Sequence, residues 1–440
     1  MVFRLAIGLS KYLVVASFML LLTSGPGRAD IRSDAVLAGW YGLVLELVRH
    51  TPTYSPPVAS RSFAYLGVTS FEAVASGSSG LNSLAGQLNG FQSLPRRTDG
   101  LAYDDAIVLH SALEFAVQNH FNNTGPTGQR AMAAVAVKLR DATYGGVAAD
   151  VIENSEAHGK LVAEQVLQWS QGDGGAVIAN MGFPLKFELK KGPGDWQPTS
   201  LISQQQAPLL PDWGNNRPFA MPLGTSCGIA PAVAYSEDPA SAFFNEALEV
   251  VTVKKNLTPE QRAIARFWSD DPMLSPTPPG HWISIALQIF KRDKLNTEKQ
   301  VDVLARLGIA EADAFIGCWQ SKFTHNLLRP VTYIKKFIDP KWEAVLITPP
   351  FPEFPSGHST QSGAAAVVLT EMLGENFAFE DATHKKDGLP PRKFASFWAA
   401  AEEAGISRLY GGIHFRDAIV RGLEQGRCIG SFTAKLKTRS

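Results

Sequence analysis

Apolar residues recur at spacings of three and four along much of the chain, which is the period of an amphipathic or buried α-helix. A Thr cap with a following Pro and a Gln three residues on, at Thr258–Gln261, marks one helix start. The pattern predicts a mainly α-helical protein. The predicted helices are Asp34–Leu47, Ser60–Ala75, Tyr103–Asn119, Gln129–Ala142, Val151–Trp169, Pro259–Trp268, His281–Lys291 and Glu298–Cys318.

The helical pattern stops between Gly172 and Asp238, where Gly, Pro and Trp are frequent. A loop of this length in a compact protein is usually functional or wraps the surface. We therefore predict an N-terminal helical bundle over residues 30–171, a long loop-rich connection over 172–257, and a C-terminal helical bundle over 258–440.

Residues 1–29 have the composition of a secretory leader. Arg4 and Lys11 supply positive charge, Tyr12–Thr23 is a short apolar core, and residues 27–29 (GRA) offer the small residues that a signal peptidase reads. An uncleaved membrane anchor is the alternative, although the apolar run is short for a span. We expect a periplasmic or secreted protein with no stable membrane span after removal of the leader.

Charge and cysteine content limit the partners, disulfides and metal sites that the protein could have. Lys and Arg total 41, Asp and Glu also total 41, and no basic stripe with interleaved aromatics occurs, so we expect no nucleic-acid partner. Any anion site must therefore be local. The three cysteines, Cys227, Cys318 and Cys428, leave room for one disulfide and at least one thiol. No Cys or His spacing is typical of zinc.

The stretch PPFPEFPSGHSTQSG, residues 349–363, joins a proline-rich turn to small residues that can open a helix. Ser356 suits an N-cap, and Gly357 suits the first turn behind it. The start of a helix carries unpaired N–H groups and partial positive charge, so it binds tetrahedral oxyanions. His358 would lie in that first turn, where it can donate or take a proton near neutral pH. A plain capped turn is the alternative.

A second stretch adds two cations. Lys322 and Arg329 are seven residues apart, or two helical turns, so they share a face. Without nearby acids, two such cations need an anion between them or separate solvation. His325 lies on the same face, and we interpret it as a pocket-wall or core residue.

A third stretch adds another arginine and a second histidine. Arg408 precedes a Gly-Gly turn, and His414 follows it, with Asp417 three residues on. Such an acid can accept the Nδ1 proton of a histidine and fix which nitrogen faces a substrate. The alternative for Asp417 is a helix-starting acid favoured by the helix dipole. Together the three stretches fit a tetrahedral oxyanion, since Arg binds its oxygens through paired donors.

These motifs resemble the signature of the type-2 phosphatidic acid phosphatase and vanadium haloperoxidase superfamily. They are Lys-x6-Arg-Pro at Lys322–Pro330, Pro-Ser-Gly-His at Pro355–His358 and Ser-Arg-x5-His at Ser407–His414. The long N-terminal helical half resembles the double-bundle haloperoxidases. FWSDDP at 267–272 and PPGHW at 278–282 resemble secreted bacterial haloperoxidase-like proteins. The resemblance implies an all-α, double helical-bundle fold of the vanadium chloroperoxidase type.

The resemblance also implies a role for each site residue. His414 bonds the central atom, the vanadium of a bound vanadate, and His358 is the acid–base residue. The family usually carries an Asp four residues after the last histidine, where this chain has Ala418. Asp417, one residue earlier, is therefore taken as the orienting acid. The oxyanion-binding residues are Lys322, Arg329, Ser356, Gly357 and Arg408.

Neighbouring residues complete the expected pocket. Trp319 and Phe351 resemble aromatic wall residues of the haloperoxidases, with ordinary core aromatics as the alternative. Asp270, Asp271 or His281 could be partners of the arginines. Some bromide-using members place an extra histidine just before the Pro-Ser-Gly-His stretch, and this chain has none there.

By resemblance, the protein is expected to be a vanadium-dependent haloperoxidase. Such an enzyme oxidises a halide with hydrogen peroxide to hypohalous acid, which reacts with a small organic acceptor. The alternative is an exported acid phosphatase in which the same pocket holds phosphate and His414 forms a phosphohistidine. Phosphate and vanadate share shape and charge, so the motifs alone do not separate the two activities. A non-catalytic oxyanion-binding protein is a third interpretation, against which the retention of both His358 and His414 argues.

Overall fold

The computed structural model describes residues 28–202 and 205–439 and confirms an all-α fold. The predicted leader, residues 1–29, lies outside the described residues except for its last two, which begin the first helix. None of the helices in the described ranges is both long and apolar enough to cross a membrane.

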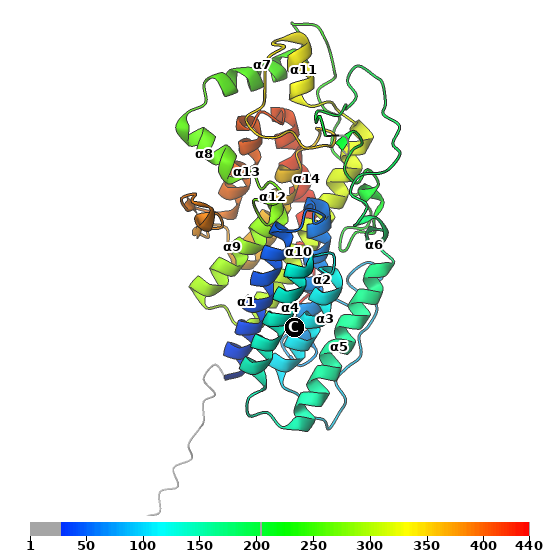
Figure 1. Cartoon of the computed structure of the whole chain (residues 1–440), viewed down its shortest axis with the longest axis vertical. Helices are drawn as coiled ribbons and strands as arrows, with labels where there is room; N and C mark the ends of the chain where they lie inside the picture. Colours follow the sequence, from blue (N-terminus) through cyan, green and yellow to red (C-terminus); the bar gives the residue numbers. More distant parts are fainter. Residues whose placement is uncertain (1–27, 203–204, 440) are drawn as a thin grey trace, which may run out of the picture.

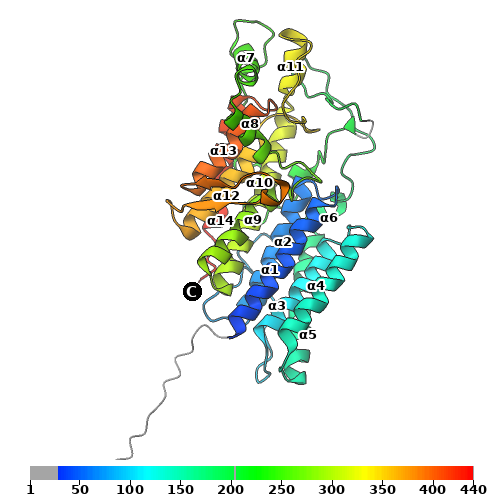
Figure 2. The same ribbon diagram turned by 60° about the vertical axis from the view of Figure 1, so that its left-hand side comes forward.

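The helices gather into two bundles, with α10 running between them (Figures 1 and 2). The first bundle contains α1 (Arg28–Arg49), α2 (Pro56–Ala75), α3 (Asp105–His120), α4 (Pro126–Tyr144) and α5 (Ala149–Gln171). The later helices are α7 (Ala242–Lys255), α8 (Pro259–Phe267), α9 (Thr277–Asp293), α10 (Thr297–His325), α11 (Pro330–Phe337), α12 (Gly357–Leu373), α13 (Phe397–Tyr410) and α14 (Arg416–Ala434). Short elements are α6 (Gly175–Ile178), 3-10 turns at Trp213–Asn215 and Lys385–Asp387, and the antiparallel strands β1 (Phe379–Asp381) and β2 (Arg392–Phe394).

Helices α2 and α10 join the two halves of the molecule. A Cβ at Gly67 would lie 2.7 Å from the carbonyl oxygen of Leu304, and one at Gly308 would lie 2.9 Å from that of Phe63. Glycine at both positions therefore lets the two helices cross at close range. One buried apolar cluster runs from α1 and α2 into α9, α10 and α12, so the two bundles share a core.

Helix α12, which starts at the Ser-Gly-His motif, packs closely on α14. Gly422, Gly426 and Gly430 repeat at every fourth position of α14 and so lie along one face. A Cβ at Gly422 would lie 2.8 Å from the carbonyl oxygen of Ser356, and one at Gly430 would lie 2.8 Å from that of Ala364. The absence of side chains on this face fixes the start of α12 against α14.

Hydrophobic periodicity missed α7, α11, α13 and α14. Helix α7 lies inside the segment predicted as a loop-rich connection, and the side chain of Ser241 caps it by accepting from Phe244 N. Helix α11 has only eight residues, and each glycine of α14 lowers helix propensity by about 1 kcal/mol relative to alanine. The start signal at Thr258 is confirmed as a capping box with Gln261. Helix α10 extends past the predicted Cys318 to His325.

The loop-rich segment between α6 and α7 wraps across the C-terminal bundle. Trp196 N donates to Asn326 O at 2.7 Å, and Leu209 N donates to Pro350 O at 2.8 Å. These two bonds lay the segment beside the end of α10 and beside the turn that precedes α12.

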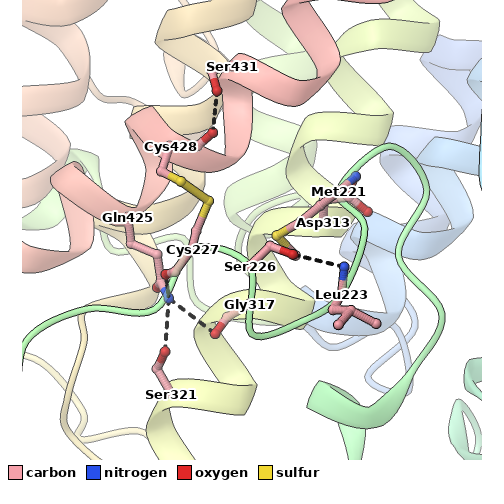
Figure 3. Close-up of a disulfide and its surroundings, with 10 residues drawn as sticks. All are labelled: Met221, Leu223, Ser226, Cys227, Asp313, Gly317, Ser321, Gln425, Cys428 and Ser431. Atoms are coloured by element: carbon pink, nitrogen blue, oxygen red, sulfur yellow. Dashed lines mark hydrogen bonds between the residues drawn. A yellow bond between two sulfur atoms is a disulfide. The ribbon is translucent and has the colours of Figure 1, made fainter.

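A disulfide between Cys227 and Cys428 ties the same segment to α14 (Figure 3). Beside it, Gln425 Nε2 donates to Cys227 O at 3.1 Å and to Ser321 Oγ at 2.8 Å, which links the loop, α14 and α10. Cys318 is a buried thiol. One bridge and one thiol therefore account for the odd number of cysteines.

Replacing both bridged cysteines by alanine is expected to lower the free energy of unfolding by about 2–5 kcal/mol. The bridge closes a loop with a sequence separation of 201 residues, and its loss returns conformational entropy to the unfolded chain. Chemical denaturation with and without a reductant measures the change. The wild-type protein should lose stability on reduction and the double variant should not; equal sensitivity of both would contradict the bridge.

Candidate oxyanion site

Four chain segments meet at one buried site. Lys322 lies in the last turn of α10, and Arg329 is the N-cap of α11. Ser356, Gly357 and His358 form the start of α12. The fourth segment contains Arg408, in the last turn of α13, and His414, two residues before α14. The side chains of Lys322, Arg329 and Ser356 are fully buried, and those of Arg408 and His414 are nearly so.

Lys322 holds the proline turn that leads into α12. Its Nζ donates to the carbonyl oxygens of Pro352 at 2.8 Å, Glu353 at 3.0 Å and Pro355 at 2.6 Å. The turn contains a cis peptide bond between Phe354 and Pro355. Burial is the main cause that lowers the pKa of Lys322 to about 7. A bound anion would favour the charged form of this lysine.

Arg329 links the turn to His414. Its Nε donates to Phe351 O at 2.9 Å, and its Nη1 donates to Ile413 O at 2.9 Å. Burial lowers the pKa of Arg329 to about 10, so the guanidinium remains cationic at neutral pH. Its Nη2 is buried and has no hydrogen-bond partner within the part of the chain that the structure describes. A buried guanidinium nitrogen without an acceptor is costly, and an oxyanion at this position would satisfy it.

The tautomer of His414 follows from its two partners. Arg329 Nη1 lies 3.1 Å from His414 Nε2. Because a guanidinium only donates, Nε2 must accept and the proton must be on Nδ1. His414 Nδ1 lies 2.8 Å from Glu353 Oε1, which also accepts from Phe415 N at 2.9 Å. Burial, and then the charges of Arg329 and Lys322, hold the pKa of His414 well below its usual value. His414 is therefore a neutral imidazole whose Nε2 lone pair faces the cations.

Glu353, and not Asp417, is the acid that orients His414. The prediction for Asp417 is wrong because the first turn of α14 carries its side chain elsewhere. Asp417 Oδ2 accepts from Val233 N at 3.3 Å, and Oδ1 lies 3.4 Å from Arg421 Nε. Glu353 stands five residues before His358, inside the proline-rich stretch that marks the site. A single acid among prolines is the signal that could have identified it.

The start of α12 is open toward the site. Ser356 caps the helix, because its Oγ accepts from Ser359 N at 3.3 Å. This hydroxyl can still donate its own proton to an anion. A Cβ at Gly357 would lie 3.9 Å from the nearest atom, Trp319 Cζ3. Packing alone does not require glycine there. The open space could instead hold an oxyanion that accepts hydrogen bonds from the first N–H groups of the helix.

Arg408 and His358 form the other side of the site. Arg408 Nε donates to Ser407 Oγ at 3.0 Å, and its Nη2 donates to Trp268 O at 2.5 Å. Burial lowers the pKa of Arg408 to about 10, while Asp270 and Asp271 act in the opposite direction. Burial and the charge of Arg408 lower the pKa of His358 to about 4. Both site histidines are thus neutral at pH 7.

Aromatic rings cover the cations, as the sequence predicted for Trp319 and Phe351. The two ring centroids lie 4.9 Å apart. Lys322 Nζ lies 5.1 Å and Arg329 Cζ lies 5.0 Å from the Phe351 ring centroid, which is within the range of cation–π attraction. His325 packs edge-on against Phe354 at 5.1 Å, which agrees with its interpretation as a wall residue.

The fold and the site define a class: a two-bundle helical protein with a buried, cationic cradle for one tetrahedral oxyanion beside two neutral histidines. The sequence matches the family model described as the VCPO second helical-bundle domain over residues 302–440. No protein with curated annotation matches the sequence significantly.

Solved structures extend the match to nearly the whole chain. The structure described as the first bacterial vanadium-dependent iodoperoxidase is 38% identical, covers 92% of this chain and 97% of its own, and superposes with a TM-score of 0.85. Apo and holo bacterial vanadium-dependent chloroperoxidases, each 14% identical, share the fold with TM-scores of 0.67 and 0.64, over 88% and 92% of this chain and 94% and 92% of theirs. The chain belongs to the vanadium-dependent haloperoxidase family.

Replacing Glu353 by Gln is expected to weaken vanadate binding about 10- to 100-fold, because residues that orient a metal-ligating histidine have effects of this size. Glutamine has nearly the same size, but its amide can turn its NH2 group toward His414 Nδ1–H, so the ring is held less firmly in the orientation that directs Nε2 at the anion. Calorimetric titration of orthovanadate measures the dissociation constant. Asp417→Asn is the matched control and should change it less than about twofold. The reverse order of effects would restore Asp417 as the orienting acid.

Replacing Gly357 by Ala is expected to leave the fold intact and to weaken vanadate binding at least about tenfold. The added methyl group has no close protein contact, but it would occupy the space at the helix start where the anion meets N–H groups. Thermal unfolding and the same titration separate the two effects. An unchanged dissociation constant would mean that the anion does not lie at the start of α12.

Proposed function

We propose that this protein is an exported vanadium-dependent haloperoxidase that prefers iodide and passes the oxidised halogen to a small organic acceptor. The observation that carries the proposal is the neutral His414, whose Nε2 lone pair is held among Lys322, Arg329 and Arg408 by Glu353. The reaction converts hydrogen peroxide, a halide ion and one proton into hypohalous acid and water.

The residues fit vanadate as the cofactor. Vanadate, when bound, supplies a Lewis-acidic centre that activates peroxide without changing oxidation state. His414 Nε2 would be the protein ligand of the vanadium. The residues that would hold the oxygens are Lys322, Arg329, Arg408, Ser356 and Gly357. The buried, unpaired Nη2 of Arg329 and the open cradle at Gly357 support this fit.

His358 is placed to move protons. Its pKa of about 4 leaves it neutral near pH 7, so it can accept a proton from incoming hydrogen peroxide. The nearby Arg408 favours the neutral form and therefore the return of that proton. Trp319 and Phe351 keep water away from the cations and strengthen their electrostatic effect.

A neighbouring pocket supports a small organic acceptor. It has a volume of about 690 Å³ and is lined largely by apolar residues of the loop-rich segment, including Phe183, Phe187 and Leu209. Leu209 O accepts from Trp319 Nε1 at 3.2 Å, so one wall of the pocket is shared with the oxyanion site. Hypohalous acid released there would meet an apolar molecule before it reached bulk water.

Two observations support export and one supports iodide. Residues 1–29 read as a secretory leader, and the Cys227–Cys428 bridge suits an oxidising compartment. The 38% identity with a bacterial iodoperoxidase supports iodide as the halide. Iodide is also the most easily oxidised of the three common halides.

The vanadate-loaded protein is expected to oxidise iodide with hydrogen peroxide, bromide more slowly and chloride not at all, followed by triiodide absorbance and by halogenation of a phenol dye. His414→Ala should abolish activity by removing the ligand. His358→Ala should lower kcat about 10²- to 10⁴-fold with a smaller effect on vanadate affinity, because it removes an acid–base group.

Hydrolysis of p-nitrophenyl phosphate by the apoprotein is the parallel measurement. Robust phosphate release that vanadate inhibits, together with no vanadate-dependent oxidation of any halide, would contradict the proposal in favour of a phosphatase. Full activity of both histidine variants would contradict the assignment of the site.

A further inference from the structure

A second buried cluster of titratable groups lies beside His358 and interacts with Arg408. Its centre is Asp270, whose carboxylate faces three histidines. His281 Nδ1 lies 2.9 Å from Asp270 Oδ1, His384 Nε2 lies 3.4 Å from the same oxygen, and His358 Nε2 lies 3.7 Å from Oδ2. Asp270 is buried and has φ of +48°, in the left-handed region that is uncommon for residues other than glycine.

His281 is a fixed cation in this cluster. Its second nitrogen, Nε2, lies 2.7 Å from Asp381 Oδ2, so carboxylates occupy both sides of the ring. Burial opposes the charged form, but Asp270 and Asp381 raise the pKa of His281 to about 10. In turn, His281 outweighs burial and keeps the pKa of Asp270 well below its usual value. Because both of its nitrogens carry protons through neutral pH, His281 supplies a fixed positive charge beside Asp270 and has no lone pair with which to accept a proton.

His384 is placed differently, between a buried and an exposed carboxylate. Its Nε2 faces Asp270, and its Nδ1 lies 3.1 Å from Asp387 Oδ2. The Asp387 side chain is 21% exposed and pairs with Arg49 of α1. A ring with an acid at each nitrogen can accept a proton on one nitrogen and release another from the second.

Two histidine nitrogens lie near Asp270 without a hydrogen bond to it. Nε2 of His358 and Nε2 of His384 are both buried, and among residues 28–202 and 205–439 neither makes a hydrogen bond of good geometry. Each faces one oxygen of Asp270, at distances slightly longer than a hydrogen bond. A small rotation of either ring closes its gap. Both orphan nitrogens therefore point to proton transfer through Asp270 rather than to a merely packed core.

We propose that His384 is a proton-transfer residue that connects solvent at Asp387, through Asp270, to His358. The inference rests on the proposed function, in which each halide oxidised consumes one proton. His384 takes a proton from solvent through Asp387 on Nδ1 and releases one from Nε2 to Asp270, which passes one to Nε2 of His358. The proton spent in forming hypohalous acid and water then arrives by a route separate from peroxide and halide.

Fixed charges on the surrounding helices set the field along this route. Arg408 of α13 acts on His358, and Asp271 lies beside Asp270 and acts on Arg408. Glu311 of α10 is not one of these charges, because burial raises its pKa well above its usual value although the charge of His281 acts in the opposite direction. Arg49 of α1 faces Asp387.

The rings of Phe267 and His281 pack edge-on against the ring of His384, which limits the motion of His384 to rotation in place.

His384→Gln in the vanadate-loaded holoenzyme tests the proposal, because glutamine keeps hydrogen bonds but cannot relay a proton. The expected kcat for iodide falls about 10- to 100-fold at pH 8, the lower end of acid–base effects, and less at pH 6, where protons are abundant. Added imidazole should restore kcat, while KM for peroxide and the dissociation constant of vanadate stay within about twofold. Asp387→Asn should show a smaller fall in kcat, which should again be greater at pH 8 than at pH 6.

His110→Gln is the matched control, since His110 is a fully buried histidine in the N-terminal bundle, bonded to Trp40. It should reproduce any general loss of stability without a changed pH profile or imidazole rescue. In the apoprotein, nitrogen-15 NMR of the histidines should show that Asp270→Asn lowers the pKa of His281 by about one to three units, because an opposite charge is removed.

Three outcomes would overturn the relay. The first is a pH profile of kcat that His384→Gln leaves unchanged, measured beside an active wild-type enzyme. The second is a loss of kcat in that variant that imidazole does not restore. The third is a stoichiometric divalent cation, detected by elemental analysis, that disappears in His384→Gln, since ligand atoms of Asp270, His281 and His384 lie within 4.8 Å of one another. A wild-type protein without halide oxidation would instead overturn the proposed function, which separates the two failures.

Discussion

Three cations enclosed in a dry interior are the constraint on which the rest of the site depends. Lys322, Arg329 and Arg408 have almost no exposure to solvent, and an unpaired buried charge is among the costliest features a fold can contain. The chain offsets this cost in part with backbone carbonyls, which accept from each of the three side chains. What remains among the described residues is the buried, unpaired Nη2 of Arg329, and a tetrahedral oxyanion would supply its missing acceptor.

The helices pack so that the three cationic side chains come together while the space at the start of α12 stays open. Glycines along α14 let α12 approach until its first turn is fixed, and the three bonds of Lys322 hold the preceding turn. Gly357 then leaves the start of α12 open. The same small residues that make α14 a weak helix by propensity make it a close neighbour, so tertiary packing outweighs local preference there.

Local spacing explains what could be predicted from the sequence. The cap at Ser356 and the capping box at Thr258 each involve residues close in the chain, and both are present in the structure. The prediction that Lys322 and Arg329 share one helix face is wrong, because α10 ends at His325 and Arg329 caps α11, although both side chains reach the same site. The orienting acid could not be found in this way. Asp417 is the nearer acid to His414 in sequence, but Glu353, 61 residues away, is the nearer in space.

Long-range pairings were hidden for the same reason. The partners Cys227 and Cys428 are 201 residues apart, and nothing in their spacing selects one pairing among three cysteines. The cluster around Asp270 draws on α9, on the turn after β1 and on the segment after α8. The sequence suggested Asp270 and His281 as partners of the arginines, whereas their shared contacts with His384 appear only once these elements are folded together.

The two site histidines show how one neutral imidazole can be given two different tasks. His414 is held neutral among cations with its Nδ1 proton directed at Glu353, so its remaining lone pair is fixed toward the anion. A group pinned at both nitrogens is suited to be a ligand. His358 is also neutral, but its Nε2 lacks a hydrogen bond and faces the carboxylate of Asp270. A nitrogen that is not held in a hydrogen bond is free to take or give a proton, and this difference in partners, rather than in residue type, separates the ligand from the acid–base residue.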